Sequence, residues 1–203
     1  MYRYKTIAQT LRTKIAVGAC RFYASLSPCV TEEEARSFIS RTKEELPGAT
    51  HHAFAYRLGF GDRLLARCDD AGEPAGTAGP PMLAVLEKVE LTNVVLVGTR
   101  YFGGVKLGVG GLIRAYRACA EAGVNEAHIL EKELMSALTI HTPYDYLGAV
   151  LREVEAGEGK VVKFDYGQGV NLEIAIPFRQ VQALPERIAS ASQGKAYILE
   201  GKN

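Results

Sequence analysis

A glycine-rich segment between an apolar strand and a helix constrains the fold of this chain more than any other feature. The preceding run, residues 93–98, is apolar and β-branched, which predicts a buried strand. Apolar residues return at helical spacing from Leu112, so we expect a helix to begin near Gly110. Glycine lets backbone N–H groups approach a ligand closely, so this strand–loop–helix turn is typical of an anion site. The five glycines of the segment are Gly103, Gly104, Gly108, Gly110 and Gly111.

Positive and aromatic side chains surround these glycines. Tyr101 and Phe102 offer flat rings on which a base or another planar group can stack. Two interpretations follow: binding of an anion such as a nucleic acid, or a glycine-rich turn whose cations only keep its surface solvated. Neither a Walker loop nor the dinucleotide fingerprint fits, because no Lys-Ser/Thr pair ends the run and Ile113 replaces the third glycine. The four cations are Arg100, Lys106, Arg114 and Arg117.

A second segment, residues 69–81, is dense in Gly, Pro and Asp and predicts a loop. Its three carboxylates, Asp69, Asp70 and Glu73, can hold a hard cation such as Mg²⁺ or act as an acid/base pair. Alternatively, together with Thr77, they organise their own turn and the neighbouring glycine segment through hydrogen bonds to backbone N–H groups. We expect this second role, with no bound metal and no cofactor.

Composition narrows the class of protein. The net charge is +1 over 203 residues, so any basic recognition surface must be local. No apolar run approaches the ~20 residues that cross a bilayer, and the N-terminus lacks a hydrophobic signal segment. We therefore expect a cytoplasmic protein without membrane contacts, and the sequence leaves its oligomeric state open. Four widely spaced cysteines indicate buried thiols in a reducing compartment: Cys20, Cys29, Cys68 and Cys119.

The first part of the chain predicts an α+β domain built around these two segments. Adjacent His51 and His52 lie on a predicted strand and point to opposite faces, so they are poor candidates to hold one metal together. The expected elements are a first strand before residue 15, a strand over 15–26, a helix capped by Thr31 and ended by Pro47-Gly48, strands over 50–59 and 64–68, and a helix opened by Pro80-Pro81.

Residues 131–203 predict a second, ferredoxin-like domain with the order βαββαβ. Reactive side chains are not concentrated in this part of the chain. We therefore divide the protein into domains of residues 1–130 and 131–203, with few contacts crossing the joint. The expected elements are a strand over 134–142, a helix from Pro143 to Gly157, hairpin strands over 161–166 and 170–176, a helix over about 181–188 and a strand over 196–199.

Two long motifs resemble the Impact/YigZ family. Residues 70–79 read DAGEPAGTAG, similar to the family signature DDGEPxGTAG, with Ala71 in place of the second aspartate. Residues 99–116 resemble the family segment TRYFGGxKLGxGGLxRAY. The resemblance implies an N-terminal sheet-plus-helices domain similar to the second domain of a small-subunit ribosomal protein. It also implies a C-terminal domain similar to a ferredoxin-like domain of elongation factor G.

These similarities imply a regulatory role in translation. We expect a non-enzymatic protein that contacts RNA, the ribosome or a translation factor through its basic glycine-rich loop and helix. The alternative is an enzyme of the same ribosomal-domain fold, whose glycine loop binds the phosphate of an anionic small molecule and whose acidic loop supplies a base. The family's eukaryotic relatives act through a protein partner and an additional N-terminal domain. We do not expect that partnership here, because the first strand is predicted at the start of the chain.

Overall fold

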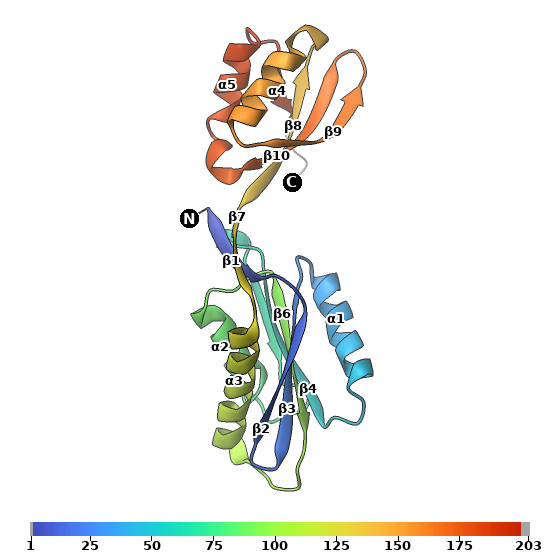
Figure 1. Cartoon of the computed structure of the whole chain (residues 1–203), viewed down its shortest axis with the longest axis vertical. Coiled ribbons are helices and arrows are strands. Elements are labelled where there is room, and N and C mark those ends of the chain that lie inside the picture. The colour runs from blue at the N-terminus through green and yellow to red at the C-terminus, as the bar shows by residue number, and fades with distance from the viewer. Residues whose placement is uncertain (1, 200–203) are drawn as a thin grey trace. The chain divides into compact units, whose positions relative to one another are not determined.

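The computed structural model describes residues 2–199, which form two compact units (Figure 1). The first unit comprises residues 4–132, and the second comprises residues 133–199 together with residues 2 and 3. Each unit has its own sheet and hydrophobic core, which confirms the predicted α+β class with two units. Within the described residues, no helix is long and apolar enough to cross a membrane.

The first unit is built on a five-stranded antiparallel sheet. Helices α2 (Gly79–Lys88) and α3 (Gly108–Glu126) cover one face, and α1 (Glu32–Glu45) covers part of the other (Figure 1). In sheet order the strands are β2 (Leu11–Val17), β3 (Cys20–Pro28), β6 (Val94–Tyr101), β4 (His51–Leu58) and β5 (Leu65–Asp69), with the 3-10 helix η1 (Gly61–Arg63) before β5.

The central strand β6 is buried on both faces, which explains its continuous apolar run. Val94 and Leu96 pack with the core under α2 and α3, whereas Val95 and Val97 pack with the core under α1. At Gly98 a Cβ atom would lie 2.5 Å from the sulfur of Met82, so only glycine lets the helices approach this closely. This packing holds the glycine segment at a fixed place beyond the end of β6.

The second unit has the element order βαββαβ, as predicted, and its apolar core lies between the four-stranded sheet and two helices. In sheet order the strands are β11 (Tyr197–Leu199), β8 (Met135–Thr142), β10 (Val170–Pro177) and β9 (Lys160–Tyr166). The helices are α4 (Leu147–Ala156) and α5 (Leu184–Ala191), preceded by the 3-10 helices η2 (Tyr144–Tyr146) and η3 (Phe178–Gln180).

Two sequence predictions about the strands need correction. The strand expected over residues 15–26 is wrong, because the chain turns at Gly18, whose φ is +57°, and continues as two paired strands, β2 and β3. Apolar alternation continues across this short turn, so the hairpin looks like one strand in the sequence. A further strand, β7 (Ile129–Glu133), pairs with β1 (Arg3–Ile7) and was not predicted. Its mixed, charged sequence carries no apolar alternation.

Candidate functional site

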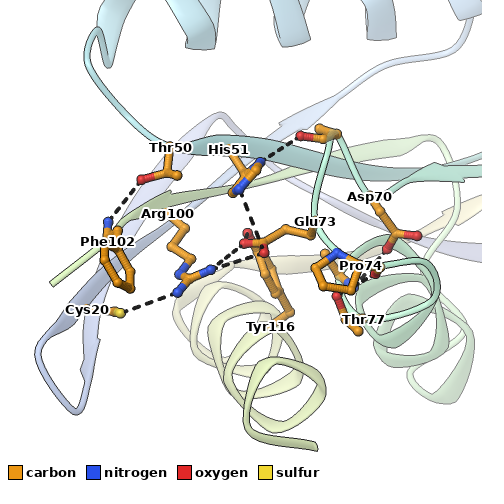
Figure 2. Close-up of polar contacts among 12 residues, drawn as sticks. Cys20, Thr50, His51, Asp70, Glu73, Pro74, Thr77, Arg100, Phe102 and Tyr116 are labelled. Carbon is orange, nitrogen blue, oxygen red and sulfur yellow. Dashed lines mark hydrogen bonds and ion pairs between the residues drawn. The ribbon is translucent and has the colours of Figure 1, made fainter. Parts of the chain in front are cut away.

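A buried carboxylate, Glu73, joins the acidic loop to the sheet and to α3 (Figure 2). Its Oε1 accepts hydrogen bonds from Arg100 Nη1 at 2.9 Å and from the Tyr116 hydroxyl at 2.8 Å. Its Oε2 accepts from the same Arg100 nitrogen at 3.0 Å and lies 3.8 Å from His51 Nε2. These partners come from β6, α3 and β4, so a single side chain of the loop ties three elements together.

Arg100 is enclosed by its partners. Its Nη2 lies 3.7 Å from the Cys20 sulfur, and its guanidinium lies 5.5 Å from the centroid of the Phe102 ring. Burial opposes the charged form, but the hydrogen bonds with Glu73 outweigh it and raise the pKa of Arg100. Burial, reinforced by the charge of Glu73, raises the pKa of Tyr116, so its hydroxyl stays protonated and donates.

Arg100 therefore differs from its sequence interpretation as a surface contact for phosphate. It is only 6% exposed, and its guanidinium points inward to Glu73. A cation committed to a buried carboxylate cannot turn to a ligand without stranding that carboxylate, which argues against a direct role in binding nucleic acid. The carboxylate that pairs with Arg100 is that of Glu73, and not that of Asp69 or Asp70 in the same loop.

The carboxylate of Asp70 accepts several hydrogen bonds from the backbone of its own loop. Its carboxylate accepts from the backbone N–H groups of Gly76 at 2.7 Å, Ala78 at 2.8 Å and Gly79 at 2.9 Å. Burial favours the neutral acid, but these three donors outweigh it and lower the pKa of Asp70. Thr77 donates its hydroxyl hydrogen to the Pro74 carbonyl oxygen at 2.7 Å.

The acidic loop shows no metal-binding arrangement. Asp69 accepts from the backbone N–H of Ala71 at 2.6 Å, and the Ala71 carbonyl oxygen lies 2.9 Å from His51 Nδ1. His52 faces the opposite side of the sheet, where its Nδ1 lies 3.0 Å from Thr99 Oγ1. Across residues 2–199, no group of three or more His, Cys, Asp or Glu side chains is arranged to hold a metal ion.

The glycine segment forms an exposed loop that ends at the start of α3. The loop is fixed by contacts at its first residues: the Phe102 N–H donates to Thr50 Oγ1 at 3.1 Å, and Gly103 packs against the turn between β2 and β3. A Cβ atom on Gly103 would lie 1.9 Å from the Ala19 carbonyl oxygen, so this contact requires glycine. The predicted residues Gly104, Lys106, Gly108, Gly110 and Gly111 follow; the last is half-buried and the other four are exposed.

Exposed cations lie on the loop, on α3 and on the first hairpin. Lys106 and Arg114 are exposed, and Arg117 continues the same row along α3 at a spacing of three residues. Lys14 on β2 and Arg21 on β3 are exposed on the sheet face that α1 only partly covers. Because Gly103 joins the hairpin turn to the glycine loop, we call Lys14, Arg21, Lys106 and Arg114 the basic end of the first unit.

Two tyrosines lie among the cations of the hairpin. The Arg21 guanidinium lies 5.2 Å from the ring centroid of Tyr101, and Lys14 Nζ lies 5.9 Å from that of Tyr23. The two rings meet edge to face at 5.8 Å, and the Tyr101 hydroxyl donates to the Pro47 carbonyl oxygen at 3.1 Å. The sequence analysis selected Tyr101 as a site residue but not Lys14, Arg21 or Tyr23. The turn at Gly18 was the missing signal, because it sets which hairpin side chains face Tyr101.

The fold and these contacts define a two-unit α+β protein whose acidic loop is joined to strand β6 by a buried Glu–Arg pair. Models of protein families match both units: an "Impact N-terminal domain" over residues 19–124 and a "Domain of unknown function (DUF1949)" over residues 140–195. The chain belongs to the IMPACT family, which confirms the predicted resemblance.

Similar proteins cover the whole chain. IMPACT family member YvyE of Bacillus subtilis is 36% identical over 100% of this chain and 93% of its own length. IMPACT family member YigZ of Escherichia coli is 33% identical over 88% of each chain. Protein IMPACT of Homo sapiens is 35% identical over 43% of this chain and 28% of its own length. A crystal structure described as that of a hypothetical protein superposes with a TM-score of 0.76 at 29% identity, covering 100% of this chain and 99% of the other.

Proposed function

We propose that this protein is a non-enzymatic regulatory protein associated with translation, and that it binds RNA, free or within the ribosome, across the basic end of its first unit. Membership of the IMPACT family supports the regulatory, translation-associated part of this proposal. The contact with RNA rests on one observation: within residues 2–199, none of the four exposed cations of the basic end has a carboxylate ion-pair partner. A cytoplasmic location stays a prediction.

The pairing of neighbouring cations makes this observation informative. On the same sheet face and on α1, Arg12 pairs with Glu45 and Arg36 pairs with Glu32. A cation already paired must give up its carboxylate before it meets a phosphate, whereas an unpaired exposed cation loses only counterions and water. The basic end combines four such unpaired cations with the uncapped start of α3, and this combination favours a polyanion.

The start of α3 adds backbone donors to these side chains. No side chain caps the helix at Leu107, and the first turn contains Gly108, Gly110 and Gly111. The first N–H groups of a helix lack intrahelical acceptors and favour a negative charge, and glycines leave room for a phosphate to approach them. Lys106 before this turn and Arg114 after it flank the same region.

The enzymatic alternative is less favoured, because two of the three carboxylates of the acidic loop are already engaged. Asp70 accepts hydrogen bonds from three backbone N–H groups, and Glu73 is buried against Arg100. A carboxylate held by several donors or in an ion pair is poorly suited to take a proton from a substrate. Asp69, which is exposed, is the carboxylate that this alternative would need as its base. The experiment below also distinguishes RNA from an anionic small molecule as the ligand of the glycine loop.

The test is a binding titration of purified full-length protein with single-stranded and ribosomal RNA at several salt concentrations. We expect the affinity to fall steeply with salt. Lys106→Ala, Arg114→Ala and Arg21→Ala should each lower the slope of log affinity against log salt by roughly 0.7–1, because each removes about one phosphate contact. Lys5→Ala is the matched control, since Lys5 is exposed in the same unit but is paired with Glu90 at 3.1 Å.

The variants must also keep the melting temperature of the unaltered protein, because exposed cations contribute little to folding. An unaltered protein with no salt-dependent affinity for either RNA would refute the RNA proposal. If inorganic phosphate or a nucleotide then bound and lost affinity in Lys106→Ala, the glycine loop would be assigned to a small anion instead.

A further inference from the structure

Strand β9 is an outer strand of the sheet in the second unit (Figure 1). Its inner side pairs with β10, and no strand of the described chain pairs with its outer side. Every second residue of such a strand points its N–H and C=O groups outward, where another strand can pair with them. Soluble proteins usually restrict this pairing with short strands, bulges and charges along the edge.

The side chains of β9 are unusually apolar for an exposed edge. Val162 is 68% exposed, Phe164 40% and Tyr166 65%. The rings of Phe164 and Tyr166 stack at 6.0 Å with an interplanar angle of 7°, so they form one aromatic strip along the strand. Apolar side chains on an unpaired edge favour association with another strand over a free surface.

The order of charges along β9 indicates which strand can pair with its outer edge. Antiparallel pairing of two identical strands about a twofold axis has a register set by the residue at its centre. With Phe164 at the centre, Lys163 of each copy lies opposite Asp165 of the second copy. Val162, which comes next and would lie opposite Tyr166, is the residue at which β9 shifts register against β10. This register thus gives two opposite-charge pairs on one face of the joined sheet, while its apolar pairs form the other cross-strand contacts.

The neighbouring registers are worse. Centring the axis on Lys163 places two lysines directly opposite each other, and centring it on Asp165 does the same with two aspartates. We propose that two copies of this chain associate through β9, antiparallel and centred on Phe164, to form one continuous eight-stranded sheet. The proposal is independent of RNA binding.

Two features of β9 make this association reversible. The pairing of β9 with β10 shifts register between Glu173 and Ile174, so the regular part of the edge is short. Lys163 also has a partner within the chain, Glu173 at 3.6 Å. Because both side chains of that pair are more than half exposed, Lys163 can exchange it for Asp165 of the second copy at little cost. We expect a dimer whose population rises with protein concentration.

Charge exchange tests both the partner and the register. Sedimentation equilibrium of the full-length protein over a wide concentration range should show a monomer–dimer equilibrium. Lys163→Asp and Asp165→Lys each place like charges opposite each other twice, so each should raise the dissociation constant by about tenfold. The double variant restores two opposite-charge pairs and should dimerise like the unaltered protein. Lys195→Asp, an exposed reversal outside β9, is the matched control and should change nothing.

A cross-link provides a second test that needs no charge change. Only the residue on the twofold axis faces itself, so Phe164→Cys should give a disulfide-linked dimer on oxidation, and Tyr166→Cys, which faces Val162, should not. A protein that stays monomeric, a dimer insensitive to Lys163→Asp, or a double variant that remains as weak as the single ones would overturn the proposal. A monomer that instead binds an extended peptide along β9 would assign this edge to a different protein.

Discussion

Replacing Glu73 by alanine should destabilise the first unit more than any exposed charge change. The substitution leaves Arg100, a residue only 6% exposed, without its carboxylate, and it leaves the buried Tyr116 hydroxyl without its acceptor. Breaking a buried ion pair from one side costs about 3–5 kcal/mol, because the remaining charge is uncompensated. The whole free energy of unfolding of a domain is about 5–15 kcal/mol, so a large fraction would be lost.

Urea unfolding followed by circular dichroism, with hydrogen exchange of the β6 amides to isolate the first unit, measures this loss. Glu90→Ala is the matched control: it breaks the exposed pair with Lys5 and should cost about 0–1 kcal/mol. The double variant Glu73→Leu/Arg100→Met should recover most of the loss, because it removes both charges. If Glu73→Ala costs no more than Glu90→Ala, the buried pair does not hold the acidic loop to the sheet.

Three further predictions concern the loops and the second unit. Asp70→Ala should lower the free energy of unfolding by about 1–3 kcal/mol, because all three backbone donors lose their acceptor. Asp70→Asn should lower it by less, because the remaining amide oxygen can still accept from Ala78 and Gly79. Since folding lowers the pKa of Asp70, its contribution is complete above its unfolded pKa of about 3.9 and is lost as pH falls through the lower folded pKa, which acid titration of both variants would show. Gly103→Ala should destabilise the first unit because its Cβ would collide with the Ala19 carbonyl, whereas Gly110→Ala, whose nearest neighbour is the end of a flexible arginine at 3.4 Å, should be neutral or stabilising in urea unfolding. Residues 131–203 expressed alone should melt cooperatively in calorimetry, because the core of the second unit lies within them.

Local sequence patterns predicted the parts of the fold that local physics controls. The apolar run of β6, the proline-opened helix α2 and the element order of the second unit follow from periodicity and turn chemistry. The prediction that Asp70 binds the backbone of its own turn needs only local information, because the N–H groups that donate to its carboxylate lie within nine residues of it. Long-range pairing was not accessible in this way: β7 has no apolar alternation, and it is a strand only because β1 lies beside it.

The candidate site shows the same limit in its chemistry. Arg100 and Tyr116 lie 27 and 43 residues after Glu73, so their spacing in the sequence does not show that they contact this carboxylate. The contact depends on how α3 crosses the sheet. The sequence therefore treats Arg100 as one of four similar cations, whereas the fold separates it from the others by burial. Its neighbours Lys106, Arg114 and Arg117 remain exposed. One cation of the motif is therefore held by a buried carboxylate, and the exposed ones are those on which the proposed RNA contact depends.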